Sequence, residues 1–257
     1  MSAPLLAVEG LSKRFGATHA CRSISFELEE GEALAVVGES GSGKTTLLHM
    51  IAGLLPADSG TVLYRNRDGV SRELGIMSEG ERRALMRTQW GFVHQDAARG
   101  LRMNVSAGGN IGERLMALGE RHYGRIRASA QDWLERVEIP ANRLDDSPQT
   151  YSGGMRQRLQ IARNLVTAPR LVFMDEPTGG LDVSVQARLL DLMRGLIAEM
   201  GLAVVLVTHD LAVARLLSNR ILVMKQGEVI ESGLTDRVLD DPQAPYTQLL
   251  VSSVLAA

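Results

Sequence analysis

The chain has 257 residues, with 28 Lys and Arg against 30 Asp and Glu, so its formal net charge is −2. Hydrophobic residues make up 45% of the chain and charged residues 23%, which excludes general disorder, and the slightly acidic balance argues against a nucleic-acid-binding protein. The single cysteine excludes a disulfide scaffold and suits a reducing cytoplasm, and the short apolar runs predict neither a signal peptide nor direct insertion in a membrane.

The N-terminal third predicts short strands and one helix. Strands are expected at 5–8 and 24–28, and the continuously apolar stretch 33–37 predicts a strand that is buried on both faces. A helix is expected at 45–55, and the turn residues at 56–60 end it.

The middle third is predicted to be mainly helical. Ser78 and Glu81 have the spacing of a capping box, which predicts the start of a helix, and a strand is expected at 91–95. The stretch 111–137 has helical periodicity, interrupted near Gly119 and Gly124. This region is rich in arginine, with Arg99, Arg102, Arg114, Arg121, Arg125 and Arg127. Such a charge run is typical of a solvated helix face as well as of a binding surface.

The last third returns to alternating strands and helices. Strands are predicted at 171–174 and 203–207, helices at 156–166, at 183–200 and from residue 211, and a hairpin joins 221–225 to 228–231. This alternation predicts an α/β fold with a mostly parallel core sheet, into which a helical block is inserted between about residues 96 and 165.

A glycine-rich loop lies between the predicted buried strand and the helix that follows it. Its sequence, GESGSGKT, fits the pattern GxxxxGK[ST] in full. Glycines let backbone N–H groups approach phosphate oxygens closely, and the start of a helix attracts anions. We expect Lys44 to reach the β- and γ-phosphates of a nucleotide and the Thr45 hydroxyl to bind Mg²⁺. The loop residues concerned are Gly38, Glu39, Ser40, Gly41, Ser42, Gly43, Lys44 and Thr45.

Polar side chains follow three of the predicted strands. Asp175 and Glu176 end the strand at 171–174, and the carboxyl ends of strands are where ligands bind in α/β folds. We expect Asp175 to hold Mg²⁺ and Glu176 to orient and deprotonate the attacking water. Gln95 is expected to touch Mg²⁺ and this water, and His209 to hydrogen-bond the γ-phosphate. Each residue alone is compatible with a structural role, so the phosphate-binding loop is what favours the catalytic interpretation.

A second glycine motif precedes the helix predicted at 156–166. Ser152, Gly153 and Gly154 offer free N–H groups, a hydroxyl and the positive end of a helix dipole, which together form another anion site. A plain N-cap, with Ser at the start of the helix, is the simpler interpretation of this motif alone. Two phosphate-binding helix starts in one chain favour the anion site.

Together these motifs resemble those of the ATP-binding-cassette (ABC) ATPases, over about residues 5–240. The matching segments, in chain order, are GESGSGKTT at 38–46, Gln95, YSGGM at 151–155, LVFMDE at 171–176, GGLD at 179–182 and His209. The first of these extends the phosphate-binding loop by one residue, Thr46. The departures are minor. Tyr151 and Met155 stand where Leu and Gln are commonest in the family, and Gly180 stands where Ala is common. None of these departures removes a ligand.

The resemblance implies a fold and an assembly. The fold is α/β, a P-loop mixed-sheet core with an N-terminal antiparallel β subdomain and an inserted α-helical subdomain. Residues 1–95 and 166–240 would form the catalytic core, 96–165 the helical subdomain and 241–257 a C-terminal tail. Two subunits, identical or paralogous, would close around two ATP–Mg²⁺.

The same resemblance gives roles to the remaining motif residues. Ser152, Gly153 and Gly154 would contact the γ-phosphate of the ATP that the other subunit holds. Asp182 would help to couple the two sites, and Phe15 would stack on adenine. Since every catalytic position is filled, the resemblance implies an active ATPase that converts ATP and water to ADP and phosphate.

One branch of the family is the most similar. The segment 95–116 and the run at 121–124 resemble the ATPase subunit of phosphonate carbon–phosphorus lyase systems, as do 137–146, 158–192 and 231–242. This likeness implies a cytoplasmic ATPase whose residues 99–127 meet soluble subunits of the lyase core.

Two alternatives remain open. The motif YSGGM and the tail at 241–250 also resemble the ATPases of peptide- and nickel-type importers, which would dock on a permease. A nucleotide-gated assembly protein that does not hydrolyse ATP is the other alternative, and the intact Glu176 and His209 argue against it.

Overall fold

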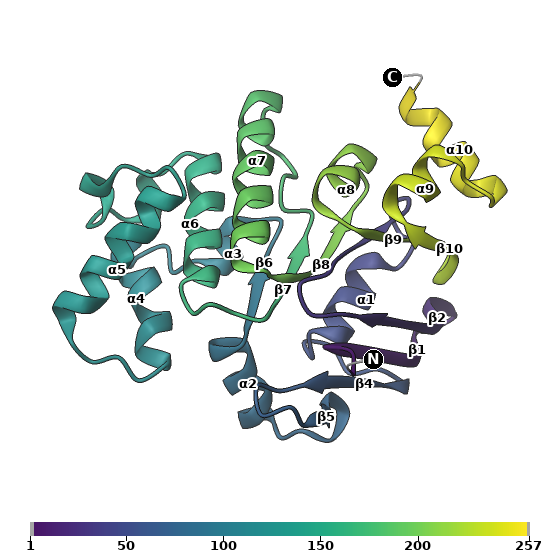
Figure 1. Ribbon diagram of the computed structural model, residues 1–257, viewed down its shortest axis with the longest axis horizontal. Coiled ribbons are helices and arrows are strands. Elements are labelled where there is room, and N and C mark those ends of the chain that lie inside the picture. Colours follow the sequence, from purple (N-terminus) through teal and green to yellow (C-terminus); the bar gives the residue numbers. More distant parts are fainter. Residues whose placement is uncertain (1–2, 256–257) are drawn as a thin grey trace. The chain divides into compact units, whose positions relative to one another are not determined.

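The computed structural model describes residues 3–255 of the chain (Figure 1). These residues form two compact units: one contains the described residues up to Arg82 and those from Gly201 onward, and the other is Arg83–Met200. Among the residues described, no helix combines the length and the apolar character that crossing a bilayer requires.

The first unit contains a four-stranded antiparallel sheet at the N-terminal end of the chain. The strand order is β2-β1-β4-β5, with β1 at Leu6–Phe15, β2 at Thr18–Leu28, β4 at Ser59–Arg65 and β5 at Ser71–Glu73. The β1–β2 pairing shifts its register between Val8 and Arg14, near the left-handed residues Gly10 and Ser23. Such bulges bend a strand without ending it, so β1 and β2 are longer than a regular alternation predicts.

The same unit holds the strands that carry the phosphate-binding loop. Their order is β10-β9-β3-β8, with β3 at Ala33–Val37, β8 at Ala203–Thr208, β9 at Arg220–Lys225 and β10 at Glu228–Leu234. β3 runs parallel to β8 and β9, and every residue of β3 and β8 is buried, as in a sheet covered on both faces. The helices of this unit are α1 Lys44–Ile51, α8 Leu211–Leu217, α9 Thr235–Asp240 and α10 Pro245–Leu255.

The predicted capping box lies in the first unit, close to Arg82. A short 3₁₀ turn, η1 at Leu74–Ile76, precedes α2 at Glu79–Thr88. The Ser78 N–H donates to Glu81 Oε2 at 2.8 Å, and the Glu81 N–H donates to Ser78 Oγ at 3.3 Å. These reciprocal hydrogen bonds confirm the capping box.

The second unit combines two parallel strands with most of the helices. β6 at Trp90–Val93 pairs with β7 at Leu171–Asp175, and the Trp90 and Phe173 rings meet edge to face at 5.3 Å. Its other elements are α3 Ala97–Gly100, α4 Ala107–Ala117, α5 Tyr123–Arg136, η2 Ala141–Arg143, η3 Pro148–Thr150, α6 Gly153–Leu165 and α7 Val183–Met200. α4 packs against both α5 and α6.

Some predicted boundaries were wrong. The strands β4 and β5 were not expected, and α6 begins at Gly153 rather than at residue 156. Gly124 lies inside the first turn of α5, so only the segment around Gly119 interrupts the helical stretch. The subdomain boundaries at 96 and 165 stay a prediction, because the second compact unit also includes β6, β7 and α7.

Cys21 is completely buried on β2. Its Sγ lies 3.7 Å from the carbonyl oxygen of Gly43, and burial raises the pKa of the thiol to about 12. Because only the thiolate is nucleophilic, this cysteine is unreactive while the protein is folded.

Candidate functional site

The phosphate-binding loop and His209 leave the same edge of the buried strands in the first unit. β3 and β8 are parallel neighbours, and Val37 at the end of β3 pairs with Thr208 at the end of β8. The loop follows β3, and His209, an exposed residue, follows β8. Both groups therefore stand at the carboxyl ends of parallel strands, where α/β proteins bind their ligands.

Two glycines let the loop backbone lie directly on neighbouring strands. A side-chain carbon at Gly38 would be 2.2 Å from the carbonyl oxygen of Met224, and one at Gly43 would be 2.0 Å from that of Ala20. Real carbon atoms do not approach an oxygen so closely, so any other residue would push the loop away from β9 or β2.

Lys44 and Ser42 give the loop its polar interior. Lys44 is only 7% exposed, and its Nζ donates to the carbonyl oxygens of Gly38 and Glu39 at 2.7 and 2.8 Å. The Ser42 hydroxyl is buried and has no hydrogen-bond partner among the residues that the structure describes. A buried ammonium and an unsatisfied hydroxyl at the start of α1 fit the oxygens of a nucleotide phosphate.

Three further predicted residues of the first unit are accessible to a nucleotide. Thr45 is exposed and Thr46 is half-buried in the first turn of α1. Phe15 is the last residue of β1 and is 52% exposed, with Lys13 Nζ 5.7 Å from its ring centroid. An exposed aromatic ring is the kind of group on which a base stacks.

The second unit brings Gln95, Asp175 and Glu176 together in the same way. β6 and β7 are parallel, and Val93 pairs with Met174, so the residues after each strand leave the same edge. A side-chain carbon at Gly179 would be 2.9 Å from Gln95 Nε2 and 3.2 Å from the carbonyl oxygen of Glu176. The amide of Gln95 therefore lies against the turn that follows the two carboxylates.

Glu176 has a strained backbone. Its φ is +46°, in the left-handed region that residues with a side chain seldom adopt, and its carbonyl oxygen accepts the N–H of Gly179 at 2.9 Å. Such a conformation costs on the order of 1–3 kcal/mol and is concentrated at functional sites. The strain is independent support for a functional role of this carboxylate.

The second glycine motif is the start of α6. Ser152 caps the helix, its Oγ accepting the N–H of Met155 at 3.3 Å. A side-chain carbon at Gly154 would be 2.6 Å from Val185 Cγ1 on α7, so the helix start rests on α7. Ser152, Gly153 and Asp182 are all exposed, which leaves this helix N-terminus open to a ligand.

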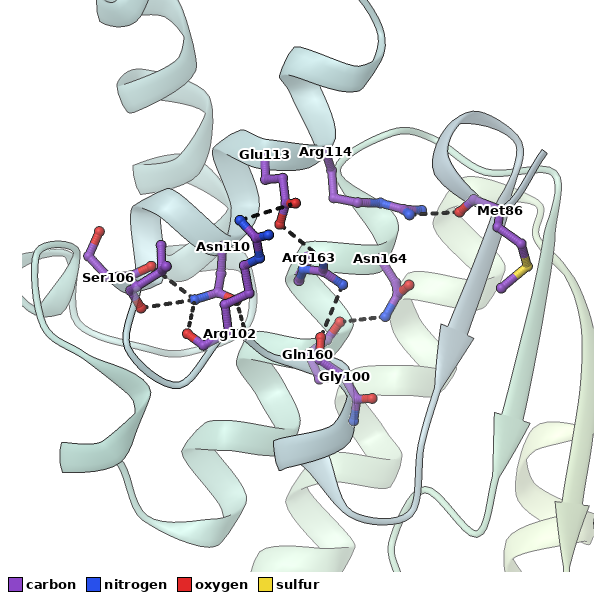
Figure 2. Close-up of polar contacts among 11 residues, drawn as sticks. Met86, Gly100, Arg102, Ser106, Asn110, Glu113, Arg114, Gln160, Arg163 and Asn164 are labelled. Carbon is purple, nitrogen blue, oxygen red and sulfur yellow. Dashed lines mark hydrogen bonds and ion pairs between the residues drawn. The ribbon is translucent and has the colours of Figure 1, made fainter. Parts of the chain in front are cut away.

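Two side chains of α6 join this helix to β6. Asn164 accepts the N–H of Phe92 at 3.0 Å and donates to its carbonyl oxygen at 3.0 Å. Gln160 does the same for His94, at 2.7 and 3.1 Å. Figure 2 shows these two amides beside each other on α6. These hydrogen bonds therefore hold the strand that leads to Gln95 against the helix that Ser152 caps.

Replacing Asn164 by Leu is expected to lower the free energy of unfolding by about 2 kcal/mol, since it removes the two buried hydrogen bonds that Asn164 makes with the backbone of Phe92. Urea unfolding measures the change. Asn142, which is exposed, is the control, and its replacement by Leu should change the free energy by no more than about 0.5 kcal/mol. Equal effects would show that the amide contacts of Asn164 contribute nothing.

The arginines between residues 99 and 127 have different surroundings. Arg125 pairs with Glu120 at 2.8 Å, and this arginine lowers the pKa of Glu120 to about 2. Arg127 forms two 2.6 Å hydrogen bonds with Asp145. Both pairs are at the surface and belong to a solvated helix face.

Arg114 is buried, which sequence reasoning missed. It is 7% exposed and donates to the carbonyl oxygens of Met86 at 2.6 Å and Trp90 at 2.8 Å. Burial and the charge of Arg163 lower the pKa of Arg114 to about 10. Figure 2 shows Arg114 reaching from α4 towards Met86, so this side chain ties α4 to the segment before β6.

A basic hollow of about 420 Å³ lies beside Arg114. The residues that line it are Arg87, Glu113, Arg114, Met116, Ala117, Arg121 and Arg163. Four guanidinium groups face one carboxylate, and Glu113 is already shared by Arg102 and Arg163 at 3.5 and 3.3 Å. The hollow, which we call the arginine pocket, therefore carries excess positive charge and attracts acidic groups.

Comparisons with known proteins agree with this geometry. The family model described as ABC transporter matches residues 21–179. The chain is 67% identical over 255 residues to the "putative phosphonates utilization ATP-binding protein PhnK" of Escherichia coli (strain K12), covering 99% of each protein. It is 35% identical over 261 residues to the dipeptide transport ATP-binding protein DppD of Bacillus subtilis (strain 168), covering 97% of this chain and 76% of that protein.

Solved structures show the same fold. The dimeric post-hydrolysis state of the ATP-binding cassette MJ0796, bound to ADP and Pi, has a TM-score of 0.78 and 29% identity, covering 90% of this chain and 98% of that one. CbiO1 of Clostridium perfringens, part of the ABC transporter complex cbiONQ, has a TM-score of 0.79 and 28% identity, covering 93% and 91%. The fold class thus agrees with the expected cassette. The chain belongs to the ABC transporter family and is an ATP-binding-cassette ATPase.

Proposed function

We propose that this ATPase binds and hydrolyses ATP to drive a conformational change in a soluble carbon–phosphorus lyase complex during phosphonate breakdown. The observation that carries the proposal is the 67% identity, over 99% of both chains, to a protein named for phosphonates utilization. Identity to the dipeptide transport ATP-binding protein reported above is about half as high, at 35%.

The residues at the two strand edges have distinct roles in the proposed reaction. Lys44 binds the β- and γ-phosphates, and His209 donates a hydrogen bond to the γ-phosphate. Glu176 takes a proton from the attacking water, which Gln95 helps to position. Phe15 stacks on the adenine ring.

Thr45, Asp175 and Gln95 fit a bound Mg²⁺, since hydroxyl, carboxylate and amide oxygens are the ligands that this hard cation accepts. When bound, Mg²⁺ would neutralise charge on the phosphate oxygens. The ion needs only one or two carboxylates in addition to phosphate, which agrees with the single carboxylate in this set.

In the proposed assembly, two subunits close around two ATP molecules. Ser152, Gly153 and Gly154 of one subunit contact the γ-phosphate held by the other, and Asp182 lies at the contact between the sites. The exposed start of α6 supports this arrangement, and MJ0796, a related cassette, has a dimeric structure. Hydrolysis removes the charge that bridges the subunits, so the dimer opens.

We propose that the arginine pocket and the apolar side chains near it form the surface that binds the lyase. Met116, Leu118 and Tyr123 are 45%, 48% and 73% exposed, although such side chains are usually buried. Arginine, methionine and tyrosine are enriched where proteins bind one another. The excess positive charge favours a partner surface with acidic residues.

The test is to recover the partner of a trapped dimer. A tagged Glu176→Gln variant, held in ATP and Mg²⁺, is purified from cells that use a phosphonate, and its partners are identified by mass spectrometry. Lyase core subunits in the bound fraction would support the proposal. A membrane permease in their place would overturn it and favour a peptide- or nickel-type importer.

Charge reversal tests the binding surface within the same experiment. Adding Arg87→Glu and Arg121→Glu to the trapped variant should abolish capture of the lyase subunits. Adding Arg237→Glu, at an exposed arginine of α9, should leave it unchanged. Equal capture with both sets would place the interface elsewhere.

A further inference from the structure

Tyr246, on the C-terminal helix α10, contacts the phosphate-binding loop. The backbone N–H of Glu39 donates to Tyr246 Oη at 3.2 Å. The carbonyl oxygen of Gly38, which belongs to the same peptide group as this N–H, accepts from Lys44 Nζ at 2.7 Å. One peptide group therefore connects the tyrosine of the last helix with the lysine of the loop.

The tyrosine ring is held firmly in the first unit. Tyr246 is 8% exposed and packs in the same hydrophobic cluster as Val37 of β3, Val223 of β9 and Leu239 of α9. Lys225 Nζ lies 4.5 Å from the ring centroid, which adds a cation–π contact. A ring fixed on several sides holds its hydroxyl at a defined point.

The start of α10 is anchored as well. The carboxylate of Glu231, on β10, accepts the N–H of Gln243 at 2.8 Å and that of Ala244 at 3.0 Å. Burial raises the pKa of this carboxyl, but the hydrogen bonds outweigh burial and hold the pKa below its ordinary value. The helix that carries Tyr246 is therefore fixed to the sheet that carries the loop.

We propose that Tyr246 is a positioning residue for ATP binding, whose hydroxyl fixes the Gly38–Glu39 peptide group and, through it, Lys44. Without this hydrogen bond the peptide group can rotate and its carbonyl leaves Lys44. The ammonium then occupies several positions, and ATP has to order it on binding, which weakens affinity. The strands that carry Gln95 and Glu176 are unaffected. This role holds whichever partner the ATPase drives.

The Tyr246→Phe variant tests the role of the hydroxyl, because it keeps the ring and its packing. We expect the Kd for ATP, measured by titration calorimetry, and the KM to rise about two- to tenfold, as for the loss of one hydrogen bond. The kcat should stay within about twofold, because binding of the ground state and of the transition state is weakened equally. Ser252→Ala is the control: it removes an exposed hydroxyl of the same helix, which donates to the carbonyl oxygen of Leu249, and the Kd should not change.

A double-mutant cycle tests the route through Lys44. In a Lys44→Ala background, Tyr246→Phe should leave the remaining Kd for ATP unchanged, since the lysine it positions is gone. The proposal is overturned if Tyr246→Phe lowers only the melting temperature and leaves Kd and KM unchanged. It is also overturned if Ser252→Ala weakens ATP binding equally, or if the effect of Tyr246→Phe persists in full without Lys44.

Discussion

Glu176→Gln is expected to lower the ATPase rate about 10²- to 10⁴-fold and to leave ATP binding intact. The amide keeps the size of the side chain and can still hydrogen-bond water, but it cannot accept the proton that the attacking water must lose. In the proposed reaction Glu176 acts on the water and does not bind the nucleotide, so affinity should not fall. Phosphate release under single-turnover conditions measures the rate, and titration calorimetry measures the affinity.

An exposed glutamate that has no role in the proposed reaction provides the control for this substitution. Glu135→Gln, on the exposed face of α5, removes the same charge and should keep the wild-type rate. If Glu176→Gln retained more than about a tenth of the wild-type rate, another group would have to accept the proton, because loss of a general base has a larger effect.

Gly43→Ala is expected to lower the free energy of unfolding by about 2–5 kcal/mol, because the alanine would be strained in a left-handed backbone conformation and its side chain would be overpacked. Its φ is +104°, and the added carbon would lie 2.0 Å from the carbonyl oxygen of Ala20, a backbone atom that cannot rotate away. The loop has to leave β2, so ATP binding should be lost too. Urea unfolding and nucleotide titration measure the two effects.

Gly41→Ala separates backbone strain from steric conflict. Gly41 also has a positive φ, +81°, but a side-chain carbon there meets no atom within 4 Å. Its replacement should cost about 1–2 kcal/mol, from strain alone. A Gly41 variant as unstable as the Gly43 variant would mean that the contact with Ala20 is unimportant.

Elements in which local and tertiary preferences agree could be predicted from the sequence. The helix at 183–200 was predicted with the bounds of α7, because its apolar residues keep one periodicity and no glycine interrupts the pattern until Gly195. The stretch 33–37 was predicted as a buried strand, and it is β3. The Ser78–Glu81 capping box is confirmed by its reciprocal hydrogen bonds.

Elements that depend on tertiary contacts were missed. Ser59 and Gly60 are residues typical of turns, yet they begin β4. The reason is that Gly60 lies against the backbone of Gly10. A side-chain carbon on Gly60 would be 2.5 Å from the carbonyl oxygen of Gly10. Glycines weaken helix propensity, yet α6 starts at Gly153. The close contact of Gly154 with Val185 explains why small residues are needed there.

In the candidate site, too, some residues could be predicted from the sequence and others could not. The pattern of the phosphate-binding loop and the carboxylates at the end of β7 were visible as sequence motifs, and their functional roles stay predictions. Burial of Arg114 was missed because charged residues are usually solvated. A periodicity signal existed: Arg114 is three and four residues after Ile111 and Asn110, and both of those are fully buried on α4.

The burial of Cys21 makes the protein convenient for spectroscopy. Since the chain has no other cysteine and this thiol is neutral and enclosed, a maleimide reagent has no fast target on the native protein. A cysteine introduced at an exposed position, such as 237, would then be modified alone. One spin label or fluorophore per subunit would report the closing of the proposed dimer as a change in a single distance, without first replacing a native residue.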